Sequence, residues 1–301
     1  MPPTSAPLQA VRWFDSSDGV RLPLYELGGR GPTLLVVHAT GFHALVYRPM
    51  IEALAALTGE PGFRVVAIDL RAHGDSITPP GLTMEWARFG EDVLAVSGVL
   101  RQERGTLLGF GHSKGGASLL RAEQNRPGTF DGLYLYEPVV PPTVLPPTMS
   151  SNAMVEAARR RRAVFESPAE AIANYASKPP FDRFTPQALR AYVEHGFRSR
   201  PDGDIELKCR PEWEAEIYDM SREHGPFERL GEVRCPVTVA RGARVHPGPG
   251  EWAPEIARRL ARGRFEEIPG AGHLGPMERP EAVAASVLEA LGRFLPSDPT
   301  D

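Results

Sequence analysis

The chain has 301 residues, of which 42% are hydrophobic and 24% charged, and these proportions exclude a chain that is wholly disordered. Its 34 Lys and Arg against 38 Asp and Glu give a formal net charge of −4, so no broad basic surface is available for nucleic acid or an anionic membrane. No apolar run approaches the ~20 residues that span a bilayer, and the N-terminal sequence MPPTSAPLQA lacks the pattern of a secretory signal. We therefore expect a soluble, cytoplasmic protein.

Eight short segments have the composition of β-strands. Two of them, Val11–Phe14 and Val20–Glu26, flank a turn-forming sequence at residues 15–19. The other six are largely apolar and β-branched runs: Thr33–Val37, Phe63–Leu70, Thr106–Phe110, Gly132–Tyr136, Pro236–Ala240 and Arg264–Ile268. Continuous apolar runs of this length are typical of strands that are buried on both faces, as in a parallel sheet.

Helical spacing of apolar residues fills the intervals between these strands. The predicted helices are Met50–Leu57, Met84–Leu100, Gly116–Gln124, Trp252–Leu260 and Glu281–Phe294. Alternation of strands and helices predicts a doubly wound α/β architecture.

One long stretch, residues 139–232, has helix signals without a convincing buried strand. Ser167 begins a capping box, and Thr185 precedes a proline at the start of a second helix. We predict an α/β core formed by residues 1–138 and 233–301, with residues 139–232 inserted as a helical cap or lid.

The sequence Gly111–Gly115 matches the pattern G-x-S-x-G. It follows the apolar strand that ends at Phe110, and it opens a helix at Gly116. In this strand–turn–helix setting, called a nucleophile elbow, the glycines permit a sharp turn that leaves the Oγ of Ser113 exposed. The alternative is a glycine-rich turn with an incidental serine.

Four motifs in this order resemble the α/β-hydrolase superfamily over nearly the whole chain. His38–Phe42 is similar to the family's oxyanion loop, and Asp69–Ser76 to its D-x-R-G-x-G-x-S turn. Gly111–Gly115 is the elbow, and Gly270–His273 resembles the late G-x-G-H motif. The resemblance implies a mostly parallel, eight-stranded, doubly wound sheet with a helical cap. It also implies a serine nucleophile that needs no cofactor and no metal.

A serine hydroxyl is a weak nucleophile at neutral pH, so a histidine must take its proton, and a carboxylate must orient that histidine. The resemblance assigns the base to His273. The family most often places the acid after its seventh strand, but residues 241–250 contain no carboxylate and Glu251 is the first. In one hypothesis Glu137, at the end of the sixth strand, is the acid, as in the haloalkane dehalogenases. Neighbouring strand ends lie only ~4.8 Å apart. In the other, Glu137 is a structural joint and Glu251, or no residue, orients His273. We favour Glu137.

The resemblance also implies two backbone N–H donors for the oxyanion hole. One is that of Lys114, directly after the nucleophile, and the other is that of Thr40. Ala39 stands where the family usually has glycine, so Gly41 or Phe42 are alternatives to Thr40.

Several charged residues have two interpretations each. The Lys114 side chain either forms a surface salt bridge or favours an acidic substrate. The run Arg159–Arg162 is either a solvated helix face or an entrance that attracts a carboxylate or a phosphopantetheine-linked acyl group. We expect Asp69–Ser76 to be a structural brace in which Arg71 bonds carbonyl groups. Aromatic residues of the cap either line an apolar pocket or simply pack: Phe165, Tyr175, Phe181, Phe184, Tyr192 and Trp213.

The other seven histidines are not predicted to be catalytic. His112 is expected to be a buried packing residue, whereas His38 and His73 are expected to bond local backbone, with contact to the substrate as the alternative. The remaining four are expected at the surface or in the cap: His43, His195, His224 and His246. No histidine pair has a convincing metal-ligand spacing, and Cys209 and Cys235 form neither a disulfide framework nor a metal-site pattern.

These observations predict a serine hydrolase that cleaves a carboxylic ester, thioester or lactone of a small-molecule acyl substrate through an acyl-enzyme on Ser113. Serine at the elbow argues against dehalogenase and epoxide-hydrolase chemistry, which needs a carboxylate nucleophile. C–C bond hydrolysis and cofactor-free perhydrolysis stay open, as does a homodimer. A hypothesis of another class is a catalytically degenerate ligand-binding protein, which the missing acid after the seventh strand motivates.

Overall fold

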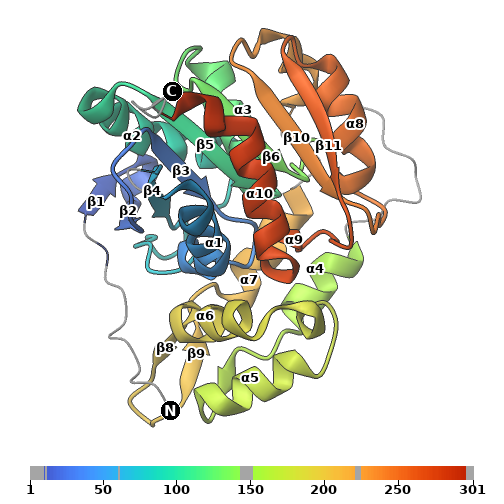
Figure 1. Cartoon of the computed structure of the whole chain (residues 1–301). Coiled ribbons are helices and arrows are strands. Elements are labelled where there is room, and N and C mark those ends of the chain that lie inside the picture. Colours follow the sequence, from blue (N-terminus) through green and yellow to red (C-terminus); the bar gives the residue numbers. More distant parts are fainter. Residues whose placement is uncertain (1–9, 11, 60–61, 143–151, 221–224, 296–301) are drawn as a thin grey trace.

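A sheet of eight strands runs through the described part of the chain, which comprises residues 10, 12–59, 62–142, 152–220 and 225–295 of this computed structural model (Figure 1). The strand order is β1-β2-β4-β3-β5-β6-β10-β11. The bounds are β1 (Arg12–Asp15), β2 (Arg21–Glu26), β3 (Thr33–Val37), β4 (Arg64–Ile68), β5 (Leu107–His112), β6 (Gly132–Tyr136), β10 (Val237–Gly242) and β11 (Gly263–Ile268). These strands coincide with the eight predicted segments, although Val11 lies outside the described residues.

The sheet is mostly parallel, as predicted. β2 runs antiparallel to both of its neighbours, β1 and β4, whereas β4, β3, β5, β6, β10 and β11 are parallel to one another. Successive side chains of a strand point to opposite faces, so Leu34 and Val36 of β3 belong to one buried apolar cluster and Leu35 and Val37 to the other. Both faces are therefore covered.

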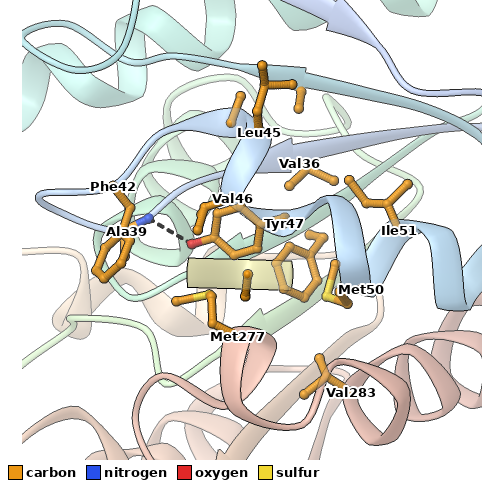
Figure 2. Packing of buried hydrophobic residues seen from close by; sticks show 14 of the residues in the cluster. Val36, Ala39, Phe42, Leu45, Val46, Tyr47, Met50, Ile51, Met277 and Val283 are labelled. Atoms are coloured by element: carbon orange, nitrogen blue, oxygen red, sulfur yellow. Dashed lines mark hydrogen bonds between the residues drawn. The ribbon is translucent and has the colours of Figure 1, made fainter. Parts of the chain in front are cut away.

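Helices form a layer on each face of the sheet (Figure 1). One layer contains α1 (Arg48–Thr58) and α10 (Pro280–Leu291), and the other contains α2 (Trp86–Arg104), α3 (Lys114–Asn125) and α8 (Pro249–Arg259). Figure 2 shows the first layer from close by, where Tyr47, Met50 and Ile51 pack with Met277 and Val283. The short helices are η1 (Ser17–Gly19), η2 (Ala44–Tyr47), η3 (Phe181–Arg183), η5 (Phe227–Glu232), α9 (Gly275–Glu278) and η6 (Gly292–Phe294). The predicted doubly wound architecture is confirmed. None of the helices in the described ranges is both long and apolar enough to cross a bilayer.

The segment between β6 and β10 is mainly helical. It contains α4 (Asn152–Arg159), α5 (Pro168–Ala176), α6 (Pro186–Gly196) and α7 (Pro211–Asp219). Ser167 and Thr185 cap α5 and α6, since their side chains accept hydrogen bonds from the N–H groups of Glu170 and Ala188. The cap boundaries at residues 139 and 232 stay a prediction.

The same segment also holds a small antiparallel sheet, which sequence analysis does not predict. Its strands, in the order β7-β9-β8, are β7 (Val164–Phe165), β9 (Ile205–Leu207) and β8 (Phe197–Ser199). Strands of two or three residues are too short to show the alternation of apolar and polar residues by which a strand is recognised. Their pairing partners also lie far apart in the sequence.

Gly115→Ala is expected to destabilise the protein by about 3 kcal/mol or more, because overpacking in a tight contact displaces backbone. A Cβ atom at this position would lie 2.1 Å from the carbonyl oxygen of Val37, so α3 could not stay seated against β3. The matched control is Gly98→Ala in α2, where the nearest atom outside the helix, on Arg126, lies 3.7 Å from the new Cβ. This control should gain up to ~1 kcal/mol of helix propensity. Urea unfolding measures both, and equal stability of the two variants would contradict the packing described here.

Candidate active site

Ser113 occupies the sharp turn between β5 and α3. Its φ of 55° lies in the left-handed region, which a residue with a Cβ adopts only when its surroundings hold it there. Three backbone hydrogen bonds do so: its N–H donates to the Tyr136 carbonyl, and its own carbonyl accepts from the N–H groups of Ala117 and Val139. The turn presents the Ser113 side chain to a cavity.

His273 reaches the same cavity from the loop between β11 and α9. Two hydrogen bonds hold this loop: the hydroxyl of Tyr136 donates to the carbonyl of Gly272 at 2.6 Å, and the N–H of Gly272 donates to Glu278 at 2.7 Å. Ser113 and His273 both line the cavity, although no hydrogen bond joins them in the described part of the chain. Catalytic hydrogen bonds of this kind commonly tighten only when substrate is bound.

The carboxylate beside His273 is that of Glu137. It follows β6 and has a positive φ of 42°. Its Oε2 lies 2.7 Å from Nδ1 of His273, and its Oε1 accepts a hydrogen bond from the N–H of Gly242 at 2.9 Å. Glu251 is engaged elsewhere, because its carboxylate accepts from the N–H of Gly248 and caps α8. Of the two acids considered from the sequence, the structure thus brings Glu137 to His273.

The loop after β3 leaves one of its three candidate donors free. The N–H of Gly41 donates to Nε2 of His73 at 3.1 Å, and that of Phe42 donates to the Ala39 carbonyl. The N–H of Thr40 makes no hydrogen bond to a described residue, and Thr40 lines the cavity together with Ser113. Gly41 has a φ of 77°, a conformation that suits glycine. This arrangement favours Thr40 over Gly41 and Phe42 as an oxyanion donor.

The second predicted donor, the N–H of Lys114, opens α3. The first N–H groups of a helix have no partner within the helix, and that of Lys114 has none elsewhere among the described residues. Lys114 is itself buried and does not line the cavity, but it directly follows Ser113, which does, so its N–H stays a predicted donor. An anion at this point would also be favoured by the helix dipole.

Two buried histidines, His38 and His73, hold the oxyanion loop in place. Both form hydrogen bonds with nearby backbone groups, as predicted. His73 Nδ1 lies 2.8 Å from the carbonyl of Arg71, which can only accept, so Nδ1 carries the proton and Nε2 receives the N–H of Gly41. His38 is arranged likewise: its Nδ1 bonds the Ala39 carbonyl and its Nε2 accepts from Leu70. Burial, and next the charge of Lys114, hold the pKa of both rings well below the usual range. Both histidines therefore stay neutral.

His112 links the oxyanion loop to the His273 loop. The Ala39 N–H donates to the hydroxyl of Tyr47 at 3.1 Å, a bond drawn in Figure 2. That hydroxyl lies 2.8 Å from Nδ1 of His112, whose Nε2 donates to the carbonyl of His273 at 2.8 Å. His112 is buried, as predicted, and it joins the backbones of two segments that the candidate mechanism uses.

The side chain of Lys114 does not form the surface salt bridge that was one of its two interpretations. It is fully buried, with Nζ 3.3 Å from both ring nitrogens of His73 and 4.3 Å from the ring centre of Phe89. Burial lowers the pKa of Lys114 to about 7. It does not line the cavity either, so direct contact with an acidic substrate has no support.

Lys114→Met is expected to raise the free energy of unfolding at pH 7 by roughly 2–4 kcal/mol. The pKa of Lys114 is about 7 in the folded protein against 10.5 for the ordinary side chain. Below pH 7 Lys114 is protonated in both the folded and the unfolded protein, so the folded protein bears the whole cost of the buried charge. Between pH 7 and 10.5 the unfolded state binds more protons, so wild-type stability rises with pH and the advantage of the variant shrinks. Urea unfolding at pH 6, 8 and 9.5 measures this difference, and a constant difference would contradict it.

The turn after β4 is a brace, but Arg71 bonds carboxylates rather than the expected carbonyls. Its fully buried guanidinium donates to both oxygens of Asp92 at 2.7 and 2.9 Å and to Asp18 at 2.9 Å. Gly74 has a φ of 52°, and Asp69 accepts the N–H groups of Ala44 and Asp75 on either side. Charge compensation explains the difference, because a buried guanidinium needs a counterion.

The cavity measures about 640 Å³, enough for a substrate the size of a typical drug. Most of its lining is apolar, and part of it comes from residues that the sequence did not single out: Trp86, Met154, Glu214, Tyr218 and Trp252. Of the six cap aromatics considered, Phe181 alone appears in the lining, whereas the others pack in the apolar clusters of the described chain. The described ranges hold no group of three or more His, Cys, Asp or Glu side chains placed to bind a metal ion.

The arginine run divides in a way that neither interpretation foresaw. Arg159, Arg160 and Arg162 are exposed, but Arg161 is turned inward, lines the cavity and pairs with Glu214. A run of four charges at a helix end gives no local signal of which one is buried.

Of the four histidines expected at the surface or in the cap, His43 is buried in the core instead, whereas His195 lies in α6 of the inserted segment, as expected, and is buried there. His43 stacks on Tyr192 with ring centres 5.9 Å apart, and His195 is packed against His43. His246 is exposed and lies at the cavity, whereas His224 lies outside the described residues.

A family model described as "Alpha/beta hydrolase family" matches residues 34–286, which is most of the chain. The chain belongs to the alpha/beta hydrolase family. The fold is therefore the α/β-hydrolase fold, as the four motifs implied, and the protein is a hydrolase of that superfamily.

Solved structures of other α/β-hydrolases superpose on nearly the whole chain. The peroxisomal α/β-hydrolase Lpx1 of Saccharomyces cerevisiae has a TM-score of 0.77 at 18% identity, covering 99% of this chain and 89% of that one. E-2-(acetamidomethylene)succinate hydrolase has a TM-score of 0.75 at 21% identity, covering 93% and 98%. At these identities the likeness concerns the fold.

Curated relatives match shorter segments of this α/β-hydrolase. Bifunctional epoxide hydrolase 2 of Mus musculus is 42% identical over 62 residues, which is 21% of this chain and 10% of that protein. Protein phosphatase methylesterase 1 of Homo sapiens is 29% identical over 181 residues, which is 56% and 44%. The matched part thus spans between a tenth and less than half of these relatives.

Proposed function

We propose that this α/β-hydrolase cleaves a carboxylic ester, thioester or lactone through an acyl-enzyme on Ser113. The observation that carries the proposal is the 2.7 Å contact of Glu137 with Nδ1 of His273, beside the strained turn that presents Ser113 to the same cavity. This pairing supplies the orienting acid that the sequence lacks after β10.

In the proposed reaction, Ser113 Oγ attacks the substrate carbonyl while His273 takes the hydroxyl proton on Nε2. Glu137 holds the Nδ1 proton and stabilises the imidazolium. The N–H groups of Thr40 and Lys114 receive the negative oxygen of the tetrahedral intermediate. Its collapse breaks the bond to the leaving group, which takes the proton from His273, and leaves the acyl group on Ser113. Water, deprotonated by His273, then releases the acid by the reverse sequence.

In this proposal the inserted segment, residues 139–232, is a cap that determines which substrate binds. Three of its residues, Arg161, Phe181 and Glu214, line the cavity. No cofactor is required. The hypothesis of a catalytically degenerate ligand-binding protein rests on the missing acid after β10, and the contact of Glu137 with His273 supports the hydrolase over it. C–C bond hydrolysis and perhydrolysis would use the same residues, so a β-diketone and a peroxide acceptor belong in the substrate panel.

Partitioning of a common intermediate tests the acyl-enzyme. Phenyl, p-nitrophenyl and thiophenyl esters of one acid should give the same ratio of free acid to methyl ester when methanol competes with water, because all three form the same acyl group on Ser113. A ratio that changes with the leaving group would contradict the proposal, as would hydrolysis without any methyl ester.

A further inference from the structure

Outside the proposed catalytic residues, the lining of the cavity includes an ion pair between two inserted elements. Arg161, just after α4, and Glu214, in α7, are joined by a 2.5 Å contact between Nη1 and Oε2. Their side chains are only 14% and 8% exposed, and both line the cavity that contains Ser113 and His273.

Arg161 has more donors than the protein satisfies. A guanidinium carries five N–H groups. Nη1 donates to Glu214, and Nη2 contacts the hydroxyls of Tyr192 and Tyr175. Within the described part of the chain, Nε and the second N–H of Nη1 therefore have no acceptor. Nε is not one of the fully buried side-chain atoms without a partner in the described chain, so it is open to the cavity that Arg161 lines. An oxygen atom of a molecule in the cavity can therefore accept a charge-assisted hydrogen bond from Arg161.

This ion pair lies directly against the oxyanion loop. A Cβ atom built on Gly41 would be 2.4 Å from Oε1 of Glu214 and 3.3 Å from Nη1 of Arg161. Gly41 is the neighbour of Thr40, the proposed oxyanion donor. An oxygen bound to Arg161 therefore belongs to a group that is only a few bonds from the scissile carbonyl.

The charges of the lining favour a neutral oxygen. Glu214 already neutralises Arg161, and Glu137 adds a further negative charge beside His273. A substrate carboxylate would add one more negative charge to a largely apolar cavity, where unpaired charge is costly. A keto, amide or ester carbonyl accepts the same hydrogen bond without that cost.

We propose that Arg161 is a specificity-determining residue that binds a second, uncharged carbonyl oxygen on the acyl side of the substrate, close to the scissile carbonyl. The substrate class is thus an oxo-acyl or related dicarbonyl compound. This inference rests on the proposed function of the same site.

The test compares three ethyl esters by chromatography of the released acids. Ethyl levulinate carries the second carbonyl, ethyl 4-methylpentanoate has the same shape without it, and monoethyl succinate carries a carboxylate. Wild type should prefer ethyl levulinate over ethyl 4-methylpentanoate in kcat/KM by about 10-fold or more, as expected for a hydrogen bond to a charged group. Arg161→Met should bring this ratio to about 1, whereas Arg160→Met, the exposed neighbour, should leave it unchanged.

Three results would overturn the inference: no preference in wild type, an unchanged ratio in Arg161→Met, or a preference for monoethyl succinate. If Arg161→Met does not fold, the double variant Arg161→Met/Glu214→Leu replaces the pair by apolar groups and supplies the ratio.

Failure of the proposed function gives a different result, since none of the esters would then be hydrolysed. Calorimetric binding of ethyl levulinate and ethyl 4-methylpentanoate to Ser113→Ala, with and without Arg161→Met, tests Arg161 in that case. Equal affinities throughout would overturn the inference.

Discussion

Ser113→Ala is expected to lower kcat for ester hydrolysis by ~10⁵–10⁶-fold, because nucleophile and base act as a unit and losing one disables both. The hydrogen bonds that hold the turn at Ser113 come from its backbone, so alanine keeps them and the variant should fold normally. Initial rates, with circular dichroism as the check on folding, measure the loss.

The matched control is Ser118→Ala in the same helix, α3. Ser118 is buried and its Oγ donates only to the carbonyl of Lys114. This variant should keep kcat within about threefold of wild type. Comparable rates for Ser113→Ala and wild type would contradict the assignment of the nucleophile.

Glu137→Gln is expected to lower kcat by ~10⁴-fold, the loss that follows when an amide replaces the orienting acid of such a triad. The glutamine carbonyl can still accept from the N–H of Gly242, so the shape of the site is kept. Its NH₂ group would face Nδ1 of His273 and select the tautomer that cannot take the proton of Ser113. Steady-state kinetics measure the loss, and a thermal melt verifies that the fold is retained.

Glu251→Gln is the control for this prediction. Glu251 is the other acid that the sequence offers, and it caps α8 instead of touching His273. Its loss should cost no more than about 1 kcal/mol of stability and leave kcat near wild type. If Glu251→Gln proved the slower variant, the acid would have to be reassigned.

The sequence predicted the sheet, the flanking helices and the family because these depend on local patterns. Apolar runs identify the strands, and the elbow has both of its glycines within a motif of five residues centred on Ser113. Glu137 could also be proposed as the acid that orients His273, because the ends of neighbouring parallel strands lie close together regardless of the conformation of the loops. The identity of the neighbouring strands follows from the topology.

Other features depend on which distant residues meet, and no local pattern reveals them. Lys114 is buried because its side chain packs against His73, in the turn after β4, and against Phe89, in α2. Arg161 turns inward because Glu214, 53 positions away, is there to pair with it. The strands β7 and β8 each form by pairing with β9, and none of the three is long enough to be recognised alone.

The proposed function depends above all on Ser113 being an activated nucleophile. The most direct test is the intact mass of wild type and Ser113→Ala after exposure to a fluorophosphonate. We expect a single phosphonyl adduct on wild type and none on the variant. An equal adduct on both proteins would contradict it, as would no adduct on folded wild type when a probe small enough for the 640 Å³ cavity is used.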